Sequence, residues 1–290
     1  MFKIFWSSLY MVAICLVRIL PRSVAIEIGY LTSIIYYFLD KKSNSVIRDN
    51  LKQILKDNFK ERYVRVVFRN FAFYLVDFMR VKNNNDSFLK RYLTIEDKNI
   101  LDNVFETSEK GVVVLSMHLG NWEITGGYLS YLGYPVSAVA MDHVIGFVDR
   151  FFKLQRKRLG IEELPFRNSL NTCQLKLKQK GVLGLLCDRD FTGNFISSTL
   201  FGKKYYLPKA PFLISLRTKS PLVLVVTVRD GYRYKMIIKG PFFYKTFNLK
   251  EMWLIVEEVV SVMEGVIKEY PQQWFLFQRF WEKPQDVVIL

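Results

Sequence analysis

The sequence predicts a mixed α/β fold, in which a mostly buried sheet is flanked by helices and preceded by a membrane-associated helical segment. Beyond residue 90, short and almost entirely apolar runs alternate with stretches of helical periodicity. Strands of this kind are typical of sheets that helices cover on both faces. Apolar residues make up 50% of the 290 residues, enough for a large core. Two apolar segments precede the first dense group of charges.

These N-terminal segments predict a membrane anchor or interfacial helices over residues 1–39. The first, 4–17, carries no charge, and a helix running on to Leu20 would extend roughly 25 Å, just short of a hydrocarbon core. The second, 24–39, contains Glu27. A buried helix pair is the alternative. A cleaved signal peptide is disfavoured, because no small-residue cleavage site is present and a second apolar segment follows at once.

Two amphipathic helices are predicted next, over about Ser45–Lys56 and Glu61–Val81, because apolar residues recur there at three- and four-residue spacings. Basic residues after apolar segments place the body of the protein in the cytoplasm by the positive-inside rule. A solvated helix face explains the same charges, and both interpretations are compatible. The polar run Asn83–Asp86 is the best candidate for a boundary. The basic residues are Arg48, Lys52, Lys56, Lys60, Arg62, Arg65 and Arg69.

The remaining chain predicts strands and helices in alternation. Strands are expected near residues 92–95, 112–117, 136–141 and 182–187, with a hairpin-like pair at 222–228 and 232–238. Helices are expected near 98–105, 121–132, 147–159, 169–179, 208–218 and 249–269. No internal repeat or phosphate-binding glycine loop is present in the sequence.

Composition limits the classes of partner. Forty-two Lys and Arg against 27 Asp and Glu give a formal charge of +15, which favours nucleic acid, an anionic membrane, an acidic carrier or a phosphorylated substrate. The 16% aromatic content suits a lipid-handling groove or a membrane-interface belt. Three widely spaced cysteines form no metal motif or disulfide framework and favour a reducing compartment. No nucleic-acid-binding module is recognisable.

The stretch 111–130 carries the first candidate site. A predicted apolar strand ends at His118, Gly120 permits a sharp turn, and Glu123 falls in the first turn of a predicted helix. A histidine takes a proton near neutral pH, and a carboxylate on its second nitrogen fixes the tautomer. The spacing alone is weak evidence, because an ordinary buried or capping histidine fits it equally well.

Four stretches in chain order carry a family resemblance. They are Arg48-x-Asn50-Leu51, Ser116-Met117-His118-Leu119-Gly120-Asn121-Trp122-Glu123, Asp188-Arg189-Asp190 with the following Gly193, Phe201-Gly202 and Leu207-Pro208, and the aromatic and basic run Trp274–Trp281. Together they resemble the bacterial lipid A biosynthesis acyltransferase family, within the His-x4-Asp/Glu glycerolipid acyltransferase superfamily. The resemblance covers nearly the whole chain.

The resemblance implies that His118 is the general base and Glu123 its catalytic partner. It also implies a functional arginine in the cluster 155–160, where Arg156 is slightly favoured over Arg158. That arginine or backbone N–H groups would stabilise the oxyanion.

Asp188 and Asp190 match the acidic motif of the family, which implies support of the site or binding of the acceptor headgroup. Asn121, between the histidine and the glutamate, joins them as a candidate substrate-binding residue. Because Asp188 follows an apolar strand, it should reach the same sheet edge as His118. Turn formation is the alternative for both aspartates. Arg189 positions a phosphate or braces the loop, and Cys187 is expected to pack in the core.

The implied activity is acyl transfer from a thioester donor, acyl carrier protein or CoA, to a hydroxyl of a lipid A precursor or similar glycolipid. No cofactor, metal or protein nucleophile is expected. The catalytic domain would span 40–290 and face the cytoplasm at the bacterial inner membrane. One alternative is acyl-CoA-dependent acylation of a phosphatidylinositol mannoside-like glycolipid or a lysophospholipid. The other is a non-enzymatic, basic, membrane-bound protein.

Overall fold

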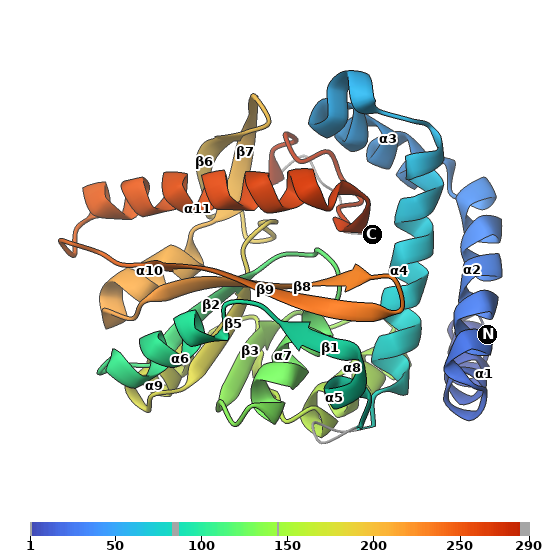
Figure 1. The fold of residues 1–290 in the computed structure, drawn as a ribbon, viewed down its shortest axis with the longest axis horizontal. Coiled ribbons are helices and arrows are strands. Elements are labelled where there is room, and N and C mark those ends of the chain that lie inside the picture. The colour runs from blue at the N-terminus through green and yellow to red at the C-terminus, as the bar shows by residue number, and fades with distance from the viewer. Residues whose placement is uncertain (1, 83–86, 144, 285–290) are drawn as a thin grey trace.

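A seven-stranded sheet forms the centre of the computed structural model, which describes residues 2–82, 87–143 and 145–284 (Figure 1). The strand order is β1-β9-β8-β2-β5-β3-β4. Five neighbouring strands, from β8 to β4, are parallel, whereas β9 and β1 run the opposite way. The strands are β1 (Leu93–Ile95), β2 (Val112–Ser116), β3 (Val136–Ala140), β4 (Glu162–Pro165), β5 (Val182–Leu186), β8 (Leu222–Asp230) and β9 (Arg233–Phe242).

Helices cover both faces of this sheet because its central strands are apolar on both faces. Val112 and Val114 of β2 pack on one side with α6 (Lys98–Thr107), α7 (Trp122–Tyr131) and α8 (Gly146–Arg158). Val113 and Leu115 pack on the other with α9 (Leu170–Lys178), α10 (Ala210–Thr218) and α11 (Leu249–Glu269). Alternate residues of a strand point to opposite faces, so a strand buried on both sides must be apolar throughout.

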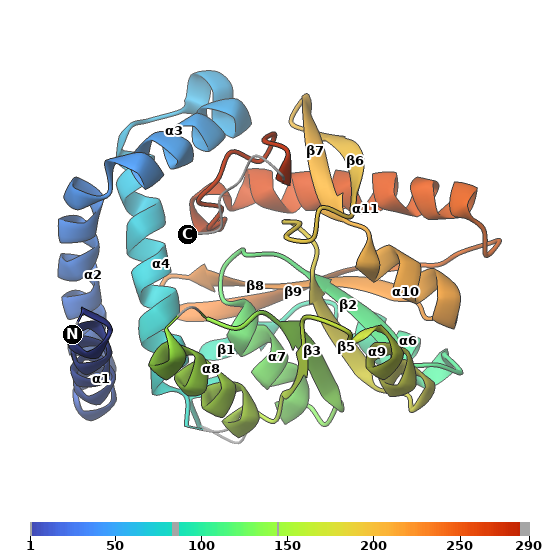
Figure 2. The same cartoon turned by 180° about the vertical axis from the view of Figure 1, so that it is seen from behind.

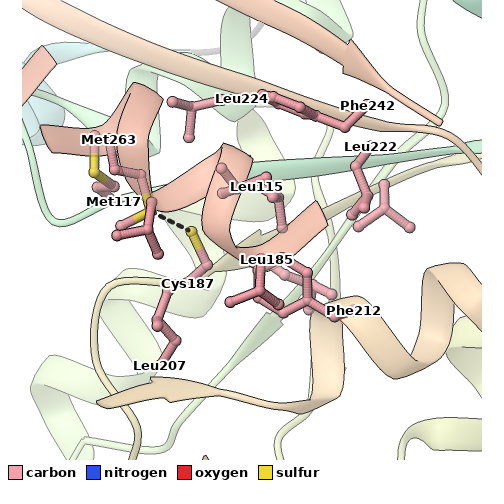
Figure 3. Packing of buried hydrophobic residues seen from close by; sticks show 14 of the residues in the cluster. Leu115, Met117, Leu185, Cys187, Leu207, Phe212, Leu222, Leu224, Phe242 and Met263 are labelled. Carbon is pink, nitrogen blue, oxygen red and sulfur yellow. Dashed lines mark hydrogen bonds between the residues drawn. The ribbon is translucent and has the colours of Figure 1, made fainter. Parts of the chain in front are cut away.

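Figure 3 shows part of the core under α11, where Leu115 and Met117 lie near Cys187 and Met263. The Cys187 thiol lies 3.8 Å from the Met263 sulfur. Burial and the neighbouring Asp188 raise the pKa of this thiol well above its ordinary value, so Cys187 stays protonated. The prediction that Cys187 packs in the core is confirmed.

The chain begins with four long helices, α1 (Phe2–Ile19), α2 (Arg22–Leu39), α3 (Lys41–Leu55) and α4 (Arg62–Arg80), and the short α5 (Ser87–Tyr92) follows them before β1. Helix α4 lies between α2 and the sheet (Figures 1 and 2). The two helices are antiparallel, since Arg22 bonds Asp77 at one end and the Tyr37 ring lies 5.8 Å from Phe68 at the other. Among the described helices, none combines the length and apolarity required to cross a membrane.

The predicted mixed α/β sheet with flanking helices is confirmed, and most predicted elements lie within a few residues of the observed ones. The sequence analysis missed β4, the short α5 (Ser87–Tyr92) and the separate hairpin of β6 (Phe195–Leu200) and β7 (Lys203–Pro208). Short 3-10 turns occur at Lys56–Asn58 and Pro271–Gln273. The expected boundary at 83–86 lies outside the described residues. The membrane-associated role of residues 1–39 stays a prediction.

Candidate active site

His118 and Asp188 follow the carboxyl ends of the adjacent parallel strands β2 and β5. The Asp188 carboxylate accepts a hydrogen bond from the backbone N–H of His118 at 2.9 Å through Oδ2. Its Oδ1 lies 2.8 Å from His118 Nδ1. The prediction that Asp188 reaches the same sheet edge as His118 is confirmed.

Asp188 is held rigidly by the segments around it. Trp274 Nε1 donates to Asp188 Oδ2 at 2.8 Å, and the Tyr205 hydroxyl donates to the Asp188 backbone carbonyl at 2.8 Å. Burial raises the pKa of Asp188, but the charge of His118 and hydrogen bonds from His118 and Trp274 outweigh burial, so this pKa lies below its ordinary value. An ionised carboxylate at Nδ1 favours the tautomer that carries a proton there and leaves Nε2 free to accept one.

The imidazole is reachable from solvent, although its partner is not. The His118 side chain is 21% exposed, whereas the Asp188 side chain is 0% exposed. The Trp122 ring lies edge-on to the imidazole, with centroids 5.1 Å apart, and stacks on Tyr74 at 4.3 Å. Aromatic walls and a buried carboxylate thus fix the ring while one edge remains open to a substrate.

Glu123, the expected partner of His118, faces a different group. Its carboxylate binds Arg156 through Nε at 3.0 and 3.1 Å and through Nη2 at 2.6 Å. Arg156 also binds Glu163 at 2.8 Å. No hydrogen bond joins Glu123 to His118 in the described part of the chain. Helix α7 starts at Trp122, which takes the position beside the imidazole, and the next helical residue points about 100° away.

Of the two arginines in the cluster 155–160, Arg156 is the one that contacts the stretch 116–123, through its ion pair with Glu123. Burial lowers its pKa, but the carboxylates of Glu123 and Glu163 raise the pKa above the ordinary arginine value. Arg156 therefore forms ion pairs with both Glu123 and Glu163. Arg158 lies two residues further along α8, is exposed, and forms no ion pair among the described residues.

Asp190 and Asn121 stabilise the turns that follow Asp188 and His118. The Asp190 carboxylate accepts hydrogen bonds from the N–H groups of Thr192 and Gly193 at 3.2 and 2.7 Å. Asn121 is fully buried and caps α7 by accepting from the Ile124 N–H at 3.1 Å. This is the turn-forming arrangement given as the alternative for Asp190; a role in substrate binding stays a prediction for both residues.

Gly120 allows the loop after His118 to lie against strand β8. Its φ is +66°, and a Cβ there would lie 2.0 Å from the Thr227 carbonyl oxygen. The Gly120 N–H donates to the Gln273 carbonyl at 2.8 Å, and the Phe275 N–H donates to the His118 carbonyl at 2.7 Å. A side chain at position 120 is therefore excluded both by the positive φ and by the close approach of the backbone.

A family model described as bacterial lipid A biosynthesis acyltransferase matches residues 1–283. The chain belongs to this family. The acyltransferase is also 22% identical over 224 residues to the phosphatidylinositol mannoside acyltransferase of Mycolicibacterium smegmatis (strain ATCC 700084 / mc(2)155), a match that covers 75% of this chain and 72% of the relative. The resemblance found from the signature blocks is thus confirmed.

Within this acyltransferase, sequence reasoning missed the contributions of Trp274 and Tyr205 to holding Asp188. Trp274 opens the aromatic run that carried part of the resemblance, so a signal was present, but nothing in that run indicated a hydrogen bond to Asp188. No group of three or more His, Cys, Asp or Glu side chains that could hold a metal ion occurs in residues 2–82, 87–143 and 145–284.

Proposed function

We propose that this acyltransferase transfers a fatty acyl group from a thioester donor to a hydroxyl of a membrane glycolipid, with a lipid A precursor as the leading acceptor. The observation that carries the proposal is the buried Asp188 carboxylate on Nδ1 of His118, whose side chain is partly exposed. Such a pair activates a hydroxyl without a protein nucleophile.

In the proposed reaction, His118 Nε2 takes the proton of the acceptor hydroxyl as its oxygen attacks the thioester carbonyl. The carbon–sulfur bond then breaks, and the imidazolium returns its proton to the leaving thiolate. Asp188 holds the ring and stabilises the imidazolium between these steps. The products are the acylated lipid and the free thiol of the carrier.

We assign Glu123 a positioning role, because its carboxylate contacts Arg156 and not the imidazole. The Glu123–Arg156–Glu163 cluster joins the first turn of α7 to α8 and β4. It therefore holds the helix that presents Trp122 to His118. Arg156 bound by two carboxylates is a poor candidate for stabilising an oxyanion.

Helices α1 and α2 support the proposal of a site at the inner membrane, facing the cytoplasm. They expose large apolar side chains although most of the chain buries such residues. We propose that they bind the membrane interface and bring the catalytic domain, 40–290, to its lipid acceptor. The exposed residues are Met11, Val12, Leu16, Ile19, Val24, Ile28, Tyr30, Leu31, Ile35, Tyr36, Phe38 and Leu39.

The acceptor is tested by mass spectrometry of lipids from cells with and without the protein. A change in acyl number confined to lipid A supports the leading acceptor. A change in a mannosylated phosphatidylinositol supports the second candidate, which the 22% identical relative favours. An unchanged lipid profile, together with no transfer from acyl carrier protein or CoA thioesters in vitro, contradicts the acyltransferase assignment.

A further inference from the structure

Arg69 of α4 and Arg229 of β8 form no ion pair within the described residues. Arg229, near the end of β8, places its guanidinium 4.1 Å from the centroid of the Phe73 ring on α4. Arg69 precedes Phe73 by one helical turn and lies on the same face. Within the described residues, neither arginine forms an ion pair or a side-chain hydrogen bond, and the Nε of Arg69 is buried without an acceptor.

The Asp77 carboxylate on the same helix is already bound by other groups. Asp77, one turn beyond Phe73, accepts two hydrogen bonds at 2.8 Å from Arg22 and a third at 2.8 Å from the Tyr234 hydroxyl. Burial is the main cause that lowers the pKa of Arg229, and the charges of Arg69 and Arg22 lower it further. Tyr234 and Asp77 act the other way, but the pKa still lies below the ordinary arginine value. Half-buried cations that repel one another are costly unless an anion joins them.

Hydrogen bonds through Gln273 connect Arg229 to the loop that follows His118. The Gln273 carboxamide accepts from the Arg229 N–H at 2.7 Å and donates to the Arg229 carbonyl at 2.9 Å. The Gln273 carbonyl accepts the N–H of Gly120, two residues after His118. Figure 1 shows α4 next to the end of the β8–β9 hairpin, which agrees with the contact between Arg229 of β8 and Phe73 of α4. Arg229 is thus fixed relative to the imidazole.

We propose that Arg69 and Arg229 bind a phosphoryl group of a substrate during acyl transfer. Two guanidinium groups match the several oxygens of a phosphate, and such charge-assisted hydrogen bonds are the strong ones. The phosphate belongs either to the acceptor lipid or to the phosphopantetheine of the thioester donor. This inference rests on the proposed acyl-transfer function for its substrates, but the anion site itself is testable without catalysis.

The first test measures the melting temperature of the full chain with sodium pyrophosphate against sodium chloride at equal ionic strength. Pyrophosphate should raise the melting temperature of the wild type and of Arg65→Gln, an exposed control one turn earlier on α4. The rise should be lost in Arg69→Gln and Arg229→Gln. Without the anion, Arg69→Gln should be at least as stable as the wild type. An unchanged rise in both variants, or a less stable Arg69→Gln without anion, overturns the inference.

The second test identifies the source of the phosphate from steady-state kinetics. Arg69→Gln and Arg229→Gln should raise the KM of one substrate about tenfold, as the loss of one bond to a charged group predicts, while kcat changes little. A higher KM for the phosphorylated acceptor, absent with its dephosphorylated form, assigns the site to the acceptor; a higher KM for the donor assigns the site to the donor. Unchanged KM values for both substrates refute the inference. A wild type inactive with every donor instead refutes the proposed function, while the pyrophosphate measurement still reports on the site.

Discussion

Two buried carboxylates flank the start of α7, and their partners differ in one decisive property. Asp188 is 1% exposed and bonds an imidazole, whereas Glu123 is 4% exposed and bonds a guanidinium. An imidazole gains and loses a proton near neutral pH, but a guanidinium does not. Similar burial therefore gives one pair that is able to transfer a proton, as proposed for His118, and one permanent ion pair. The titration range of the partner, more than the burial of the carboxylate, determines whether a pair is able to transfer a proton.

The largest effect is expected from His118→Ala, which removes the base itself. Acyl transfer should fall by about 10²- to 10⁴-fold, the usual contribution of general base catalysis, with the protein still folded. Radiolabelled acyl transfer in membranes measures the loss. His143→Ala is the matched control, because its ring packs on Phe152 and the proposed reaction gives it no role. Full activity in His118→Ala would end the proposed mechanism.

Asp188→Asn should lower acyl transfer almost as much, by about 10²- to 10⁴-fold. The amide has nearly the shape of the carboxylate but cannot stabilise an imidazolium, so kcat should fall while circular dichroism stays unchanged. Glu123→Gln should lower kcat less, since its carboxylate does not touch the ring. If Glu123→Gln proves the more severe of the two, the comparison is wrong and the partner inferred from the sequence is restored.

Breaking the second pair should affect folding more than chemistry. Arg156→Met leaves Glu123 and Glu163 buried without their cation and should cost about 3–5 kcal/mol of unfolding free energy, measured by urea denaturation. Adding Glu123→Gln to Arg156→Met should recover part of this loss, because one uncompensated charge is removed. A double variant less stable than Arg156→Met alone would show that the two side chains are not coupled as the ion pair implies.

A smaller effect concerns the pH dependence of stability. The folded-state pKa of Asp188 lies below its ordinary value, which is about 4 in an unfolded chain. The ionised Asp188 therefore contributes to the free energy of unfolding in full above a pH of about 4. This contribution is lost as the pH falls through the lower folded-state pKa. Acid titration of the melting temperature should show a shallower decline in Asp188→Asn than in the wild type. Parallel curves would contradict the lowered pKa.

The smallest effect is expected from Arg158→Gln. The side chain is exposed and unpaired among the described residues, so the unfolding free energy should change by no more than about 0.5 kcal/mol. The contrast with Arg156→Met on the same helix sharpens the comparison, because the two variants remove the same charge from opposite environments. A loss of stability equal to that of Arg156→Met would mean that Arg158 has a structural partner.

The sequence was sufficient to predict His118 at a strand end. The apolar run predicted the strand, and the family resemblance of residues 116–123 identified the histidine. The position of Asp188 after an apolar strand also predicted that it reaches the same sheet edge, but the hydrogen bond between the two side chains was not predicted. Asp188 lies 70 positions away and becomes a neighbour only because β2 and β5 pair, a fact that no local pattern contains. Glu123 was assigned as the partner through the family resemblance, but the rotation from Trp122 to Glu123 along α7 turns its carboxylate toward α8. The structure therefore offers Asp188 as a second candidate partner, and a catalytic role for either acid stays a prediction.

Other omissions have local physical causes. Strand β4 reads Glu-Glu-Leu-Pro, and its charges and proline suit an edge strand but give no strand signal. The β6–β7 hairpin lies outside the main sheet and carries no alternation that identified it as paired strands. Tyr205 of β7 is buried, and its hydroxyl donates to the Asp188 backbone carbonyl.

The bond from Trp274 to Asp188 has a consequence for the timing of protein synthesis. His118 and Asp188 leave the ribosome well before Trp274, and the segment that bonds the His118 carbonyl follows Trp274 directly. A nascent chain therefore holds the imidazole and its acid before the indole that fixes them is available. The exposed apolar helices α1 and α2 emerge earlier still. The bond that braces Asp188 beside His118 therefore forms only after residue 274 has been synthesised.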